Sequence, residues 1–86
     1  MVSLNGKPEI AYPAIWEYRL IARSGEAIMA AVLDAVGEKP HCLEPSRASG
    51  KGKFVSMKLT IEVINEDERI FYFEKLRTNE GILHIL

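Results

Sequence analysis

The stretch Lys53–Val63, KFVSMKLTIEV, alternates apolar and polar side chains without interruption. Its apolar positions share one parity, and they are Val55, Met57, Leu59, Ile61 and Val63. Successive side chains of a strand point to opposite faces of its sheet, so the pattern predicts a strand with one face on a core. The other parity, which includes Phe54, Lys58 and Thr60, is too polar to be buried as a whole. We therefore expect a sheet with one open face.

Three other segments also have the pattern of strands. Residues 15–22 alternate as a half-buried strand does, and the parity that contains Trp16 and Tyr18 is its expected core side. Residues 41–49 form a weaker strand with Leu43 inward, and Pro45 places it at a sheet edge because proline lacks a ladder donor. The turn Ala48–Lys53 joins it to the long strand as a hairpin. Residues 82–86 form a short final strand.

Two helices are predicted from their caps. Ser24 is an N-cap residue type, apolar residues then recur at helical spacing, and Gly37 is placed to end the helix. The second helix starts after Asn65, with Glu68 three residues on as a capping-box partner. Its expected inward stripe is Ile70, Phe73, Leu76 and the stem of Arg77, with Phe71 and Tyr72 on the flanks.

This order of elements predicts an α+β fold, a ferredoxin-like βαββαβ sandwich with two helices on one face of a four-stranded antiparallel sheet. Right-handed crossovers then put the first and third strands in the centre. Residues 15–86 are the expected domain. Residues 1–14 carry Gly6, Pro8 and Pro13, and they are the expected N-terminal arm.

The composition narrows the classes of protein to consider. A chain of 86 residues is one small domain, and its net charge of −1 implies no global attraction to nucleic acid or anionic membrane. The single cysteine, Cys42, makes no internal disulfide, which suits a reducing compartment. No signal peptide or membrane span is recognisable, so we expect a cytoplasmic protein.

Three stretches resemble the small bacterial YbeD-like proteins: the opening PEIAYPAIWEYRLI, the hairpin SGKGKFVSMKLTIEV and the ending ILHIL. The shared motifs are a Tyr-Pro entry, the strand that carries Trp16, Tyr18 and Arg19, and the turn with Ser49, Lys53 and Phe54. The resemblance extends from about Ile10 to Leu86. It implies a fold similar to the ligand-sensing ACT regulatory modules, and some members carry a label as lipoic-acid-related regulators. It supplies no catalytic residues.

No group of residues has the spacing of a metal or catalytic site. His41 and Cys42 are adjacent on a strand and so point to opposite faces, and His84 would join them only by chance. The acidic run Glu66–Glu68 is explained by the positive end of the helix that it starts. We therefore expect a protein that is not an enzyme and holds no metal or cofactor.

The basic residues suggest a binding surface. Those on the open-face parity and around the hairpin would converge with one aromatic ring, and the six candidates are Arg19, Arg47, Lys51, Lys53, Phe54 and Lys58. With the glycine amides of the hairpin, such a surface suits a phosphate or a carboxylate. The leading hypothesis is therefore a regulatory or ligand-binding module for a small anionic ligand.

Two alternatives stay open. GKGKFVSM is similar to an RNA-recognition strand, so a nucleic-acid module using Arg19, Phe54 and Lys58 is the second hypothesis. A single stacking ring and the negative net charge argue against it. The third is a protein-interaction adaptor. Because Ile21 and Phe54 add apolar surface to the open face and edge strands can pair, the chain is expected as a monomer or a homodimer.

Overall fold

The computed structural model describes residues 11–46 and 54–86. Their elements, in chain order, are β1 (Ala14–Ala22), α1 (Gly25–Val36), β2 (His41–Pro45), β3 (Val55–Val63), α2 (Glu66–Arg77) and β4 (Ile82–Ile85). This order confirms the predicted βαββαβ fold. β2 is shorter than the predicted strand 41–49, and the predicted hairpin turn lies outside the described residues, as does most of the predicted arm.

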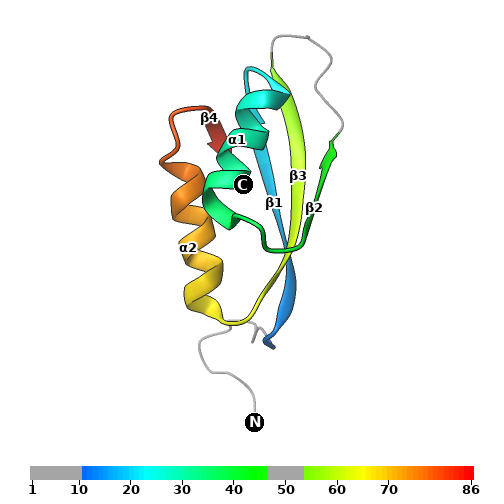
Figure 1. The fold of residues 1–86 in the computed structure, drawn as a ribbon, viewed down its shortest axis with the longest axis vertical. Coiled ribbons are helices and arrows are strands. Elements are labelled where there is room, and N and C mark those ends of the chain that lie inside the picture. The colour runs from blue at the N-terminus through cyan, green and yellow to red at the C-terminus, as the bar shows by residue number, and fades with distance from the viewer. Residues whose placement is uncertain (1–10, 47–53) are drawn as a thin grey trace, which may run out of the picture.

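The four strands form one antiparallel sheet in the order β2-β3-β1-β4. The first and third strands are therefore central, as predicted, and β2 with its Pro45 is an edge. Both helices lie on the same face of this sheet (Figure 1). The opposite face of the sheet has no helix of the described residues against it.

The core lies between the helices and the inward parity of the central strands. Leu20, Leu59 and Val63 are fully buried there, together with Ile28 of α1. Over the described part of this stretch, residues 54–63, the predicted inward parity faces the core: Leu59, Ile61 and Val63 are buried, and Val55 and Met57 are half-buried and packed against the core. No buried side-chain nitrogen or oxygen of the described residues lacks a hydrogen-bond partner.

The predicted inward stripe of α2 differs from the structure at Ile70 and Arg77, and the predicted flank differs at Tyr72. Tyr72, expected on a flank, is buried, whereas 42% of Ile70 is exposed and the side chain of Arg77 is also exposed. Leu76 is buried as predicted, and Phe73 packs on the core while staying half-buried. The helix is therefore rotated so that a tyrosine faces the core, and part of the predicted stripe is left at the surface.

The helix caps form largely as predicted. The Ser24 hydroxyl accepts a hydrogen bond from the Ala27 amide at 3.1 Å, and Asn65 Oδ1 accepts from the Glu68 amide at 2.8 Å. The capping box is altered, because the Glu68 carboxylate accepts from the amide of Ile64 and not from that of Asn65. Gly37 ends α1 at φ 62°, a backbone angle that favours glycine.

β4 contains an irregularity in its pairing with β1. Ile21 pairs with His84, but the next residue, Ala22, pairs with Ile82, so Leu83 is an extra residue on the β4 side. Ile82 and Ile85 are both buried although they are three positions apart. In a regular strand they would point to opposite faces. The bulge therefore lets both isoleucines reach the core.

Candidate functional site on the open face of the sheet

The open face of the sheet brings two of the predicted site residues together. β1 and β3 pair so that Arg19 lies directly opposite Lys58. Residues directly opposite each other in an antiparallel pair have Cβ atoms about 4.5–5.5 Å apart, so two positive side chains start from neighbouring positions. Glu44 of β2 faces Lys58 from the other side. The centre of this face is thus a small cluster of charged side chains.

Within this cluster the ionic contacts are weak. Lys58 Nζ lies 3.8 Å from Glu17 Oε2, and both side chains are partly exposed. Such exposed pairs are worth about 0–1 kcal/mol. No carboxylate of the described residues lies within ion-pair distance of the Arg19 guanidinium. An incoming anion could therefore contact both cations at small cost.

A shallow pocket of about 190 Å³ lies at this cluster. It is lined by Glu17, Tyr18, Arg19, Lys58 and Leu86. Its charged groups come from the two central strands, and Leu86 supplies apolar surface. The pocket has room for a small molecule, and its cations suit a carboxylate or a phosphate group.

Phe54 lies just before β3, on the parity of the open face, and 48% of it is exposed. Two positions along, Ser56 Oγ is 2.6 Å from Ser46 Oγ, so the hydroxyls hold the end of β2 against β3. The three other predicted site residues, Arg47, Lys51 and Lys53, lie outside the described residues. The structure therefore places Arg19, Lys58 and Phe54 on one face and leaves the predicted hairpin cluster as a prediction.

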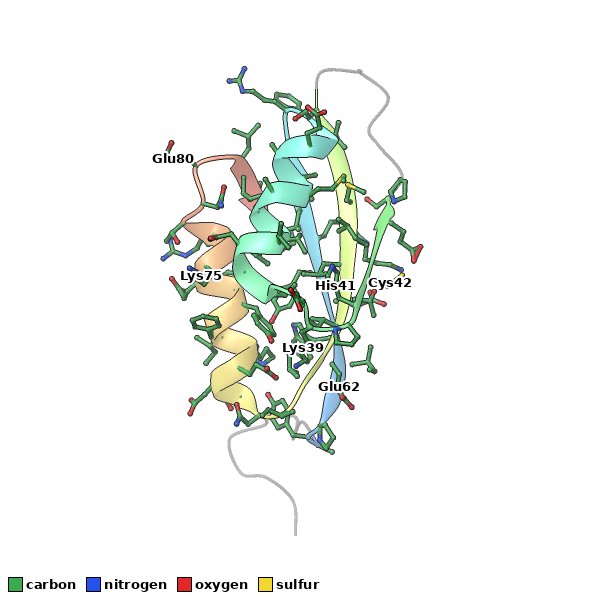
Figure 2. The ribbon with its side chains drawn as sticks, in the orientation of Figure 1. Lys39, His41, Cys42, Glu62, Lys75 and Glu80 are labelled. Carbon is green, nitrogen blue, oxygen red and sulfur yellow. The ribbon has the colours of Figure 1, made fainter. Side chains whose placement is uncertain are left out.

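The residues considered for metal binding and for nucleophilic chemistry have other contacts. His41 Nδ1 lies 2.7 Å from the carbonyl oxygen of Lys39, and the Cys42 thiol donates to Glu44 at 3.8 Å. Figure 2 shows both residues on the exposed edge strand β2. In the part of the chain that the structure describes, no three His, Cys, Asp or Glu side chains are grouped to hold a metal ion.

A second polar cluster, which the sequence did not predict, joins α2 to the loop that follows α1. Glu68 accepts hydrogen bonds from Lys39 Nζ at 2.9 Å and from the Tyr72 hydroxyl at 2.8 Å, besides the Ile64 amide at 2.7 Å. Burial opposes ionisation of Glu68, but the bonds from Lys39, Ile64 and Tyr72 outweigh it and lower the pKa of its carboxyl. Lys39 lies 29 residues away in the chain, so only the fold reveals this contact.

The next residue of α2, Arg69, also makes polar contacts with residues that are distant in the sequence. Arg69 Nε donates to the Tyr12 hydroxyl at 3.1 Å, and its guanidinium lies 4.7 Å from the centre of the Trp16 ring. The buried Tyr18 hydroxyl donates to the Arg69 carbonyl oxygen at 2.6 Å. Burial raises the pKa of Tyr18 to about 12, despite the opposing charge of Arg69. These contacts fasten α2 to β1, and we assign them to stability.

The fold defines the class of protein to which the chain is similar. The ACT domain of a GTP pyrophosphokinase from Chlorobium tepidum superposes with a TM-score of 0.58 over 84% of this chain and 94% of that one. The two sequences are 15% identical, so this likeness concerns the fold alone. It confirms the expected similarity to ACT modules.

The chain belongs to the family described as Protein of unknown function (DUF493), whose model matches residues 7–86. This confirms the resemblance to YbeD-like proteins. An uncharacterised protein of Helicobacter pylori (strain J99) is 35% identical over 80 residues, which cover 93% of each chain. The solution structure of protein HP0495 from H. pylori is 31% identical and superposes with a TM-score of 0.81, over 100% of this chain and 94% of that one.

The helices of the structure do not resemble membrane spans. Among the described residues, neither α1 nor α2 is long and apolar enough to cross a membrane.

Proposed function

We propose that the protein is a non-enzymatic regulatory module that binds a small anionic ligand on the open face of its sheet. The observation that carries the proposal is the pairing of Arg19 with Lys58 beside a pocket of about 190 Å³. The ACT-like fold supports a ligand-binding role, because YbeD-like proteins resemble ACT modules and ACT modules sense ligands.

The chemistry of the site indicates the class of ligand. Arg19 offers a planar fork of donors, and Lys58 a compact charge, which together suit a carboxylate or a phosphate. Leu86 lines the same pocket and provides apolar surface beside these charges, and Phe54 is exposed on the same face, four positions before Lys58. A small carboxylate with a short apolar part is thus the ligand that the proposal predicts.

The negative groups on the same face argue against a nucleic acid. Glu17, Glu44 and Glu62 are exposed and lie on the open-face parity of β1, β2 and β3. They would repel a phosphate backbone, which binds through the summed effect of many cations. A single pocket with two cations can still hold one anionic group.

The test is a thermal-shift screen of small carboxylates and phosphates, followed by calorimetric titration of each hit. A ligand that binds only the folded state raises the melting temperature. Arg19→Ala and Lys58→Ala should each weaken binding about tenfold or more, as expected for loss of one charge-assisted hydrogen bond of about 1.5–3 kcal/mol. Lys75→Ala is the matched control, because this exposed lysine pairs with Asp34 on the helix side (Figure 2).

Two results would contradict the proposal. One is a screen in which no carboxylate or phosphate shifts the melting temperature of the wild type. The other is a hit whose affinity drops in Lys75→Ala as much as in Arg19→Ala. Titration with single-stranded RNA at low and moderate salt tests the alternative, since RNA binding through these cations would weaken steeply with salt.

A further inference from the structure

The open face of the sheet differs in character on the two sides of the Arg19–Lys58 pair. Toward the start of β1, its positions on the two central strands include Glu17 and Glu62, both exposed. Ile15 lies opposite Glu62. An apolar group laid in this direction would cover the two carboxylates and desolvate them, which is costly. The apolar part of a ligand held at the cations is therefore expected to extend the other way, toward the end of β1.

Toward the end of β1 the open face carries apolar side chains. Ile21 lies two positions after Arg19, so it shares the open face, and it is half-buried. Ile21 pairs with Ser56, and Phe54 lies two positions before that serine, which makes Phe54 a diagonal neighbour that an aromatic side chain can bridge. Leu86 lies opposite Arg19, since they exchange both backbone hydrogen bonds, at 3.2 and 2.9 Å. We call Leu86, Ile21 and Phe54 the apolar strip.

The polar group beside the apolar strip already has a partner. The hydroxyl of Ser56, opposite Ile21, is 2.6 Å from that of Ser46. Covering a polar group costs free energy when the group loses its hydrogen bond to water, but this hydroxyl keeps its bond to Ser46. His84 lies on the other side of Ile21 and is exposed, so it stays at the margin of the strip. An apolar chain can thus lie across this row of the sheet at small cost.

The strip also limits the length of such a chain. Lys58 and Phe54 are four positions apart, which is about 13 Å along an extended strand. A methylene chain advances about 1.3 Å per carbon, given C–C bonds of about 1.5 Å. A chain of about eight to ten carbons therefore reaches from the cations to Phe54. Positive charge at one end and apolar surface along the rest are complementary to an anion with a long apolar tail.

We propose that the anion site takes a medium-chain acyl carboxylate, with its carboxylate on Arg19 and Lys58 and its alkyl chain along the apolar strip. This inference rests on the proposed function, because the head group occupies the same pair of cations. It lengthens the apolar part of the ligand from the pocket to the whole strip. It also gives Ile21 and Phe54 a role in binding, as the residues that select for chain length.

The test is calorimetric titration of the full chain with butyrate, hexanoate, octanoate, decanoate and dodecanoate, each below its micelle-forming concentration. The affinity should rise about two- to threefold for each added methylene, because an open strip buries only part of each group. The rise should end near decanoate, where the alkyl chain has passed Phe54. Binding of butyrate, which does not reach that ring, reports the cation pair alone.

Variants of the strip separate the tail from the head group. Phe54→Ala should weaken decanoate binding about fivefold or more and leave butyrate binding unchanged. Ile21→Thr should act in the same direction, and it keeps a β-branched residue in the strand if the first variant misfolds. Leu33→Ala is the matched control, since Leu33 is apolar, 63% exposed and on α1.

Several results would overturn the proposal. Affinity that does not depend on chain length would remove the alkyl site, while binding of the short acids would leave the anion site of the proposed function intact. Failure of every acid and phosphate to bind would remove both. A rise with chain length that persists in Phe54→Ala and Arg19→Ala, or that Leu33→Ala abolishes, would indicate nonspecific binding. An unliganded dimer that Phe54→Ala dissociates would assign the strip to a second copy of the chain.

Discussion

On the helix-covered side of the sheet, the Glu68 carboxylate accepts three hydrogen bonds, from an amide, a lysine and a tyrosine. On the open side, the Glu17 carboxylate has one contact, a 3.8 Å approach to Lys58 with both side chains partly exposed. The two carboxylates lie on opposite sides of one sheet, Glu68 on the helix α2 and Glu17 on the strand β1. The comparison distinguishes two kinds of polar group. Those like Glu68 stabilise the fold, and those like Glu17 are exposed and available to a ligand.

The largest expected effect tests the covered side. Leu59→Ala removes a fully buried side chain and should lower the free energy of unfolding by about 2–5 kcal/mol. Its neighbour in β3, Thr60, is on the open parity, so Thr60→Ala should cost less than about 1 kcal/mol. Urea denaturation of the two variants measures both values. Equal losses would mean that the open face is packed, contrary to the structure.

The next effect compares the two carboxylates directly. Glu68→Gln leaves an acceptor for the Ile64 amide but removes the charge that Lys39 pairs with, and it should cost about 1–3 kcal/mol. Glu17→Gln should cost at most about 1 kcal/mol. Both are measured at pH 7 by chemical denaturation. A larger loss for Glu17→Gln would reverse the assignment of the two faces.

The dependence of stability on acid follows from the same residue. The folded pKa of Glu68 is lowered, so its contribution is present above its unfolded pKa of about 4.3 and is lost as pH falls through the folded value. Stability of the wild type should therefore fall more than that of Glu68→Gln below about pH 4. Melting temperatures at several acidic pH values give the two curves. If the melting temperatures of the wild type and Glu68→Gln fall in parallel with pH, the ionised Glu68 carboxylate does not stabilise the fold through its partners.

Tyr18 gives the corresponding dependence on alkali. Its folded pKa is raised to about 12, so its contribution is present below its unfolded pKa of about 10 and is lost as pH rises through the folded value. The wild type should therefore lose stability between these values, and Tyr18→Phe should lose less. Ultraviolet titration of phenolate formation, followed alongside unfolding, tests this. A buried tyrosine that ionises near pH 10 without unfolding would contradict it.

The smallest expected effect on stability is on the open face. Arg19→Ala removes an exposed side chain whose guanidinium lacks an ionic partner among the described residues, so it should change stability by about 0.5 kcal/mol or less. Thermal denaturation measures this change. If Arg19→Ala weakens anion binding and leaves stability unchanged, the open face serves binding and the covered side serves stability. A large destabilisation would assign Arg19 a structural role.

The sequence predicts the strands and caps because their causes are local. The alternation over Lys53–Val63 has a period of two, and Ser24 and Asn65 each bond within three residues. The parity of the open face follows from the same alternation. That parity alone is enough to assign Arg19 and Lys58 to one surface.

The features that the sequence could not predict depend on distant partners. α2 has three consecutive aromatic residues, Phe71–Phe73, so several rotations give a plausible apolar stripe, and contacts with α1 and β4 select the one that buries Tyr72. The Lys39 contact to Glu68 and the pairing of Arg19 with Lys58 likewise arise from tertiary register. The amino-acid sequence alone says little about such contacts, because their partners are far apart along the chain.

The bulge at Leu83 has a consequence for how the end of the chain tolerates change in length. With the extra residue, Ile82 and Ile85 both reach the interior, and each fits because the spacing between them is three. Replacing Leu83 keeps this spacing, and deleting it would leave the two isoleucines two positions apart, where a regular strand also turns both side chains to the core. This segment should thus tolerate the loss of Leu83 as well as its substitution, because either change keeps Ile82 and Ile85 on the covered face of the sheet.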